Sequence, residues 1–422
     1  MNENAPAPTL REATRLWLRI GLLSFGGPAA QISMLHEELV EKRKWVAEDR
    51  FQHALRYCTF LPGPEAQQLA TCCGWYLHGI RGGLVAGVLF FVPAAFLLWL
   101  LSWIYAAWGQ VALVGAIFHG LKAAVLAILV MAVIRLAKKS LKGFGAYGIG
   151  LLTMLAFESA PFPLVIALAA LAGWLMSRSR YRKVMFPLPR HRDAPLPERG
   201  SGWGTTLKTL TFGLAVWWAP IMVAWLLLGK GHWLTQQGLF FSKAACVTFG
   251  GAYAVLPYVA HHAVEAQWIT ETQTLDGLAL AETTPGPLII VLEFFGFQGG
   301  WVQHGAWPRL VAGTLGAAMT VWATFAPSTF FALLGVPHLE KIRQVKWLTG
   351  ALAGISCAVI GVMAWLALWM GWQSLFPQGG FDGFILLAAP LAFAAMHFKK
   401  AGMVTVLLAC AAAGVGWKLL GW

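Results

Sequence analysis

The stretch "SFGGP" at Ser24–Pro28 decides how the chain is read, because "TFGGA" at Thr248–Ala252 repeats it 224 residues later. A second motif follows each of them at nearly the same distance, "LPGPE" at Leu61–Glu65 and "TPGPL" at Thr284–Leu288. Glycine and proline interrupt helices. Both halves of the 422-residue chain therefore carry the same two helix breaks in the same order.

Two further landmarks keep that order. Trp45 corresponds to Trp268, and "FVPAAF" at 91–96 resembles "FAPSTF" at 325–330. Four landmarks with almost constant spacing predict an internal duplication. The predicted organisation is a first repeat at 1–177, a basic linker at 178–206, an extra transmembrane helix and loop at 207–238, and a second repeat at 239–422.

The composition predicts an all-α polytopic membrane protein. Of the residues, 58% are hydrophobic and 12% are charged, whereas a soluble domain averages about 25% charged residues. A helix needs about 20 residues to cross the hydrocarbon, and several apolar stretches are shorter, so we expect some segments to be broken or re-entrant. Thirteen apolar stretches are found, at 16–35, 53–77, 83–108, 111–136, 144–157, 161–176, 207–228, 239–260, 275–297, 310–335, 347–370, 381–396 and 401–420.

The basic residues indicate how the chain crosses the bilayer. The net charge of +13 resides in short loops, which is typical of topology signals and argues against nucleic-acid binding. The extra crossing at 207–228 would turn the second copy over, which predicts an inverted repeat. Matching loops agree, since 36–52 has four Lys or Arg residues and 261–274 has none. With the linker in the cytoplasm, we expect the N-terminus inside and the C-terminus outside.

The helix breaks predict an anion site. A broken helix leaves backbone N–H groups without intrahelical partners, here those of 29–31 after "FGGP" and of 65–67 after "PGP". Inside a bilayer such backbone survives only where it is buried in protein or faces a cavity. Helix N-termini carry about half a positive charge and bind oxyanions. Ordinary helix kinks are the alternative, but the matched spacing of both copies argues against it.

Polar side chains lie near the breaks. Arg19 precedes Ser24 by five residues, and Lys243 precedes Thr248 by five. A cation at depth costs at least about 2.5 kcal/mol, which makes both functional candidates, although snorkelling to the interface stays an open alternative. The neutral donors that suit a desolvated oxyanion are Ser24, Gln31, Gln67, Gln68, Thr248, Thr283 and Thr284.

Three acidic residues, Glu65, Glu282 and Glu293, fall inside apolar stretches and away from their first residues. Glu65 and Glu282 flank the "PGP" breaks and are the candidates for coupling transport to protons. Lys122 and His119 form another polar spot, which we rank lower because the second copy does not repeat it.

The motifs, extended as "LPGPEAQQLA" at 61–70 and "TFGGAYAVLPYV" at 248–259, resemble the chromate ion transporter family in its long two-domain form. The resemblance covers about 14–176 and 239–420. It implies a bacterial inner-membrane protein that expels chromate and confers chromate resistance, and that by analogy recognises sulfate-like dianions. The second copy departs from the pattern at Ala252 and Leu288, so we expect the first copy to dominate binding.

The residues and the resemblance together define one set of candidate substrate-binding positions. They are Arg19, Ser24, Phe25, Gly26, Gly27, Pro28, Gln31, Pro62, Gly63, Pro64, Glu65, Gln67, Gln68, Lys243, Thr248, Gly250, Gly251, Thr284, Pro285, Gly286 and Pro287.

Two other functions compete with chromate export. A sulfate transporter or exchanger is the first, because helix ends do not distinguish two tetrahedral dianions. An intramembrane enzyme acting on lipid phosphate is the second, and the sequence has no HExxH, GxSxG or GxxxxGK[ST] motif to support it. We expect no cofactor and no metal site. The expected partners are the anion and the lipid bilayer, with a homodimer left open.

Overall fold

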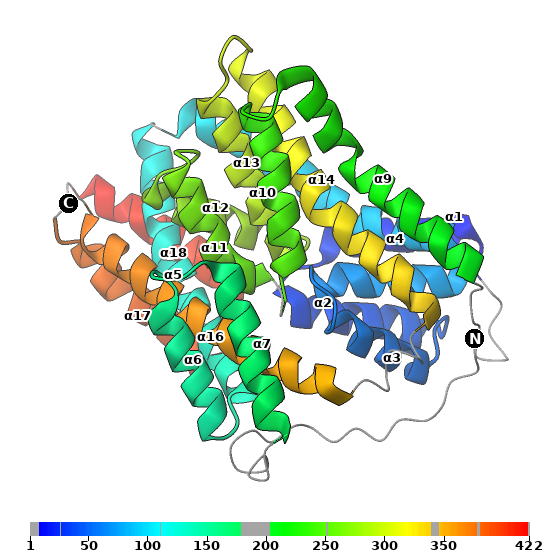
Figure 1. Cartoon of the computed structure of the whole chain (residues 1–422). Coiled ribbons are helices and arrows are strands. Elements are labelled where there is room, and N and C mark those ends of the chain that lie inside the picture. Colours follow the sequence, from blue (N-terminus) through cyan, green and yellow to red (C-terminus); the bar gives the residue numbers. More distant parts are fainter. Residues whose placement is uncertain are drawn as a thin grey trace. The chain divides into compact units, whose positions relative to one another are not determined.

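A computed structural model describes residues 8–25, 27–109, 111–178, 203–249, 252–338, 346–377 and 380–420, and every regular element in these ranges is helical (Figure 1). Five helical stretches are long and apolar enough to cross a membrane: Glu65–Trp108, Ala112–Lys138, Thr206–Leu228, Arg309–His338 and Gly350–Leu375. Shorter apolar helices accompany them. These features support the predicted class of an all-α membrane protein. The number of membrane segments and the inversion of the second copy stay predictions.

The helices gather in two compact units, and each unit takes segments from both halves of the chain. The first unit comprises Met1–Trp99, Pro189–Val255 and Thr284–Leu348. The second comprises Leu100–Leu188, Leu256–Thr283 and Thr349–Trp422. The leading segments of both predicted repeats therefore share the first unit.

The first unit opens with a series of short helices. They are α1 (Leu10–Leu23), α2 (Gly27–His36), the π-helix η1 (Glu37–Lys42) and α3 (Glu48–Cys58), followed by α4 (Glu65–Trp108). A capping box starts α1: the Thr9 hydroxyl accepts from the Glu12 amide, and the Glu12 carboxylate accepts from the Thr9 amide. Trp17, Phe51 and Phe90 are among the side chains buried in the shared core of this group.

A sharp turn divides α4 into two helices. His78 and Gly79 leave helical geometry, with Gly79 at φ +60°. The two halves fold back on each other, because a Cβ on Gly74 or Gly82 would collide with the backbone of the other residue. In the second copy the corresponding halves are separate helices, α13 (Val291–Val302), which follows the 3-10 turn η2 (Leu288–Ile290), and α14 (Arg309–Gly335).

The extra helix of the sequence, α9 (Trp203–Leu228), also belongs to the first unit. It packs with α10 (Trp233–Val247) and α14 around a small apolar core (Figure 1). Trp217 Nε1 on α9 donates to Ser242 Oγ on α10 at 3.0 Å, and Trp322 Nε1 on α14 donates to Trp217 O at 3.0 Å. These two bonds attach α9 to helices that precede and follow the breaks of the second copy.

The second unit is built around α5 (Ala112–Ser140). The helices α12 (Glu271–Thr283), α17 (Gly383–His397) and α18 (Met403–Leu419) pack against it (Figure 1). A Cβ on Gly120 would collide with the backbone of Cys410, and one on Gly414 would meet Gly120. Such close backbone approach at small residues is typical of helix packing in membranes. The unit also contains α6 (Phe144–Ala156), α7 (Phe162–Arg178), α16 (Lys346–Leu375) and most of α11 (Ala252–Glu265).

Candidate functional site

All four motifs interrupt helices. At the "FGG" motifs α1 ends at Leu23 and α10 ends at Val247, and the next helices begin at Gly27 and Ala252. At the "PGP" motifs α3 ends at Cys58 and α12 at Thr283, and helical structure resumes at Glu65 and Leu288. The predicted residues Gly26, Gly250 and Gly251 lie outside the described part of the chain.

The breaks of the two copies are bonded to each other crosswise in the first unit. Ser24 O, in the first "FGG" break, accepts a hydrogen bond from the Gly286 amide of the second "PGP" break at 2.8 Å. Thr248 O, in the second "FGG" break, accepts one from the Gly63 amide of the first "PGP" break at 2.6 Å. Because Ser24 corresponds to Thr248 and Gly63 to Gly286, the two bonds are the same contact made twice with the copies exchanged.

The glycines of the "PGP" breaks have no room for a side chain. Gly63 has φ +122° and Gly286 has φ +113°, a region that favours glycine. A Cβ on Gly63 would lie 2.8 Å from Ser328 Oγ, and one on Gly286 would collide with the Cβ of Ala94. Ala94 and Ser328 correspond in "FVPAAF" and "FAPSTF". The glycine contacts therefore repeat the crosswise pattern.

Three buried glutamines of the first copy lie at or beside the breaks, and two of them, Gln31 and Gln68, bond break carbonyls. Gln31 Nε2 donates to Gly286 O at 2.5 Å and to Ser24 O at 3.3 Å. Gln68 Nε2 donates to Pro62 O at 2.7 Å. All three are buried, and the corresponding residues of the second copy are apolar. They are Gln31, Gln67 and Gln68 in the first copy, and Val255, Ile290 and Val291 in the second.

Several polar atoms at the breaks are buried without a hydrogen-bond partner among the described residues. They are Ser24 Oγ, Gln31 Oε1 and Gln68 Oε1. A buried polar atom without a partner costs about 1–3 kcal/mol, and the two glutamine oxygens can only accept a hydrogen bond, so of these atoms only the Ser24 hydroxyl could bind an anion. The Ser24 hydroxyl can donate, as an oxyanion requires.

The two predicted cations, unlike the donors at the breaks, are not buried. Arg19 on α1 and Lys243 on α10 are exposed, as is Phe25, and neither cation bonds a break residue within the described ranges. Each stands one and a half turns before its break, as the sequence indicates. The amides and neutral donors of the breaks thus form the buried part of the candidate site, and the cations lie outside it.

The remaining predicted residues are distributed as follows. Thr248, Thr284, Pro285 and Pro287 are buried, and so are Gly63 and Pro64, while Gly27, Pro28, Pro62 and Glu65 are half-buried. Glu282 is 5% exposed and belongs to the second unit, whereas Glu65 belongs to the first.

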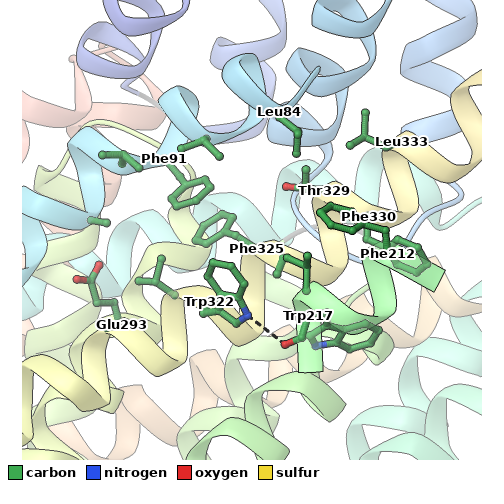
Figure 2. A pocket seen from close by; sticks show the side chains of 18 of the residues that line it. Leu84, Phe91, Phe212, Trp217, Glu293, Trp322, Phe325, Thr329, Phe330 and Leu333 are labelled. Atoms are coloured by element: carbon green, nitrogen blue, oxygen red, sulfur yellow. Dashed lines mark hydrogen bonds between the residues drawn. The ribbon is translucent and has the colours of Figure 1, made fainter. Parts of the chain in front are cut away.

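An apolar cavity of about 1,100 Å³ lies beside this region in the first unit, lined by α4, α9 and α14 (Figure 2). Phe91 and Phe325 stack on its wall with ring centroids 4.2 Å apart. Thr329 connects the cavity to the breaks, because its hydroxyl accepts from Gln67 Nε2 at 2.8 Å. Glu293 is another lining residue; it is 4% exposed, and its Oε2 has no hydrogen-bond partner in the described chain. Sequence reasoning noted Glu293 within an apolar stretch but gave it no role.

A helical apolar chain in which four helix breaks are joined in two crosswise pairs, with buried neutral donors beside them, has the architecture of a membrane transporter. Comparison with known sequences makes this specific. The chain belongs to the chromate transporter family, whose profile, described as "Chromate transporter", matches residues 11–174 and 235–415. The family resemblance inferred from the motifs is confirmed.

Relatives of similar length carry the corresponding name. A chromate transport protein of Pseudomonas aeruginosa is 32% identical over 409 residues, which cover 94% of this chain and 90% of the relative. A chromate transport protein of Cupriavidus metallidurans is 29% identical over 364 residues, covering 85% and 82%. A probable chromate transport protein of Synechococcus elongatus is 29% identical over 376 residues, covering 88% and 86%. No solved structure matches the chain significantly.

Proposed function

We propose that this protein is a secondary carrier that moves chromate outward across the bacterial inner membrane and so confers chromate resistance. The anion binds where the "FGG" and "PGP" breaks of both copies meet. The crosswise pair of hydrogen bonds, from Gly286 to Ser24 and from Gly63 to Thr248, carries this proposal because each bond joins a break of one copy to a break of the other.

The chemistry of the breaks suits a dianion. The first-turn amides of α2 and α4, such as those of Ala29 and Gln67, lack intrahelical acceptors and carry the positive end of the helix dipole. The unpartnered Ser24 hydroxyl adds a donor. Because these donors are neutral, no permanent positive charge holds the anion, and the bound anion can dissociate again.

The crosswise contacts also support the predicted inverted repeat. Contacts of the type i to j and j to i arise when two similar elements are related by a two-fold axis. If that axis lies in the membrane plane, the two copies have opposite orientations, as the extra helix α9 between them requires. In the proposed topology the N-terminus is in the cytoplasm and the C-terminus outside, because the basic loops mark the cytoplasmic side.

The membrane potential favours export. An interior-negative potential drives an anion outward with about 2.3 kcal/mol per charge per 100 mV, so a dianion gains about twice that. Neither ATP nor a cofactor is needed for such a step. The relatives' names support chromate as the ion. Sulfate transport or exchange is the second candidate, because the buried donors at the breaks would bind any tetrahedral dianion.

Flux measurements in proteoliposomes test the proposal. Wild-type protein should move chromate under an imposed potential, with sulfate measured alongside. Gly27→Leu should lower the flux, since Gly27 has φ +76°, and Gly148→Leu, with nothing within 4 Å of its Cβ, is the matched control. Arg19→Gln is compared with Arg15→Gln, also exposed on α1. Unaltered flux in both test variants would remove the assignment of the site. Absence of chromate and sulfate flux in the wild type would remove the transport function.

A further inference from the structure

The second unit contains a buried ion pair that the proposed site does not use. Lys122 Nζ on α5 lies 3.7 Å from Asp276 Oδ1 on α12. The side chain of Asp276 is 5% exposed and that of Lys122 is 18% exposed. The hydroxyl of Tyr105, at the end of α4, donates to Asp276 Oδ2 at 2.7 Å. Two helices thus bring polar groups to a carboxylate on a third.

Lys122 lies deep in an apolar helix. Ten residues separate it from Ala112, the first residue of α5, which corresponds to about 15 Å of helix and to the middle of a hydrocarbon layer about 30 Å thick. A lysine at that depth costs at least about 2.5 kcal/mol, so its retention indicates a function.

The pair is loosely made. The distance of 3.7 Å exceeds that of a hydrogen bond, and Asp276 Oδ1 has no hydrogen-bond partner among the described residues. An ammonium group offers three donors. In a pair that serves only stability, Lys122 Nζ and Asp276 Oδ1 would lie within hydrogen-bond distance, because the attraction between buried charges offsets the cost of their desolvation only with good geometry. Lys122 therefore retains donor capacity for a ligand.

Other titratable groups surround the carboxylate. His119, one turn before Lys122 on α5, interacts with Asp276 and lies 2.6 Å from Asp382 Oδ2 at the start of α17. The groups that face Asp276 are thus Lys122 and His119 from α5 and Tyr105 from α4, with Asp382 behind His119. Among them Lys122 supplies the ammonium group.

We propose that Lys122 and Asp276 form a second oxyanion site. While the site is empty, Asp276 pairs with Lys122. When Asp276 takes up a proton, a tetrahedral dianion takes its place as the partner of Lys122. The identity of the anion rests on the proposed function. Protonation removes the competing charge, so anion binding takes a proton from solution. Binding should therefore weaken as pH rises, by up to about tenfold per pH unit for one linked proton.

The double variant Lys122→Gln, Asp276→Asn replaces both charged side chains with neutral ones. It distinguishes a role in anion binding from a purely structural role. Replacing both members of a buried ion pair is often neutral for stability, whereas removing one leaves an unpaired charge and can prevent folding. The double variant should fold, and its binding of sulfate at this site should be about tenfold weaker or more. A double variant that binds and transports like the wild type would show that the pair is structural and overturn the proposal.

Asp276→Asn alone gives the complementary result. It keeps Lys122 charged and frees it, so sulfate should bind as tightly as in the wild type at low pH and lose its pH dependence. The neutral pair Arg43→Gln with Glu38→Gln, which removes an ion pair of the first unit, is the control, and it should retain anion binding. Retained pH dependence in Asp276→Asn would contradict the proposal.

The measurement uses the full-length protein in detergent, with sulfate binding and proton uptake recorded in weakly buffered solution and chromate flux recorded in proteoliposomes. Proton uptake that accompanies sulfate binding in the wild type and disappears in both Asp276 variants is the expected result. Binding and flux are separate readouts. A wild type that binds anion with proton uptake but moves none would remove the carrier function and keep this site.

Discussion

Phe91 and Phe325 stack face to face, with ring centroids 4.2 Å apart and planes inclined by 9°. They occupy the same position in "FVPAAF" and "FAPSTF", so each ring contacts its own counterpart in the other copy. Self-contact of this kind arises close to a two-fold axis. The stack therefore marks where α4 and α14 meet in the first unit, beside the crosswise bonds of the breaks.

Substituting Gly286 tests how closely the copies fit. Gly286→Ala should lose about 2 kcal/mol or more of stability, because alanine is strained at φ +113° and its Cβ would collide with Ala94. Thermal unfolding of the full chain in detergent measures this. Gly148→Ala, whose Cβ meets nothing within 4 Å, should lose nothing. Adding Ala94→Gly should recover part of the loss, since it removes the collision but not the strain. Equal melting temperatures for Gly286→Ala and Gly148→Ala would refute the contact.

Gln31→Val converts a first-copy glutamine into its second-copy counterpart, Val255. The variant loses the bonds to Gly286 O and Ser24 O and leaves a buried carbonyl unsatisfied. We expect a loss of about 1–3 kcal/mol and a reduced chromate flux. Gln52→Val, which removes only an exposed bond to Glu48, serves as the control. Full flux in Gln31→Val would mean that the first copy does not dominate binding.

Glu38 should make stability depend on acid pH. Burial raises the pKa of Glu38, but the hydrogen bond from Lys42 and the charge of Arg43 outweigh it and hold the pKa below the ordinary 4.5. The stabilisation is therefore present above pH 4.5 and is lost as pH falls through the lowered pKa. Glu38→Gln should cost about 1 kcal/mol at neutral pH.

Thermal unfolding between neutral and acid pH checks this expectation. Wild type and Glu38→Gln should converge as the pH falls below 4.5. Glu41→Gln is the control, because the Glu41 side chain is 62% exposed and its pairing with His36 should contribute little. A gap between wild type and Glu38→Gln that persists in acid would show that the ion pairs are not its cause.

The proton that is coupled to transport has two candidate sites, and they predict opposite effects of substitution on the pH response of transport. Glu65 and Glu282, which flank the "PGP" breaks, are the candidates from sequence, and Asp276 is the candidate from structure. If Asp276 carries the proton, the double variant Glu65→Gln, Glu282→Gln keeps the pH response of transport and Asp276→Asn loses it. Flux measured over a pH series, with chromate fully deprotonated throughout, distinguishes the two. Loss of the response only in the double variant would favour the breaks.

The helix breaks could be predicted from sequence because their cause is local. Glycine and proline act on the backbone where they stand, and α1 ends one residue before Ser24, at the predicted motif. The crosswise bonds could not be predicted. Gly63 and Thr248 are far apart in sequence, and the motif spacing gives no indication of which break meets which.

Side-chain roles were harder to predict for two physical reasons. Asp276 stands at the start of an apolar stretch, where a carboxylate is expected to be solvated, and only the fold shows Lys122 and Tyr105 beside it. Arg19 and Lys243 stand at matched distances from the breaks, but distance along a helix does not fix the face on which a side chain lies. Both are exposed.

The crosswise bonds have a consequence for biosynthesis. Gly63 N–H emerges from the ribosome well before Thr248 O, its acceptor, and the carbonyl of Ser24 likewise precedes the amide of Gly286. During translation the leading copy must therefore sit in the membrane with open backbone until the trailing copy arrives. A chain truncated anywhere before Gly286 would keep Ser24 O without this donor, so the fold of the first unit depends on synthesis of both copies.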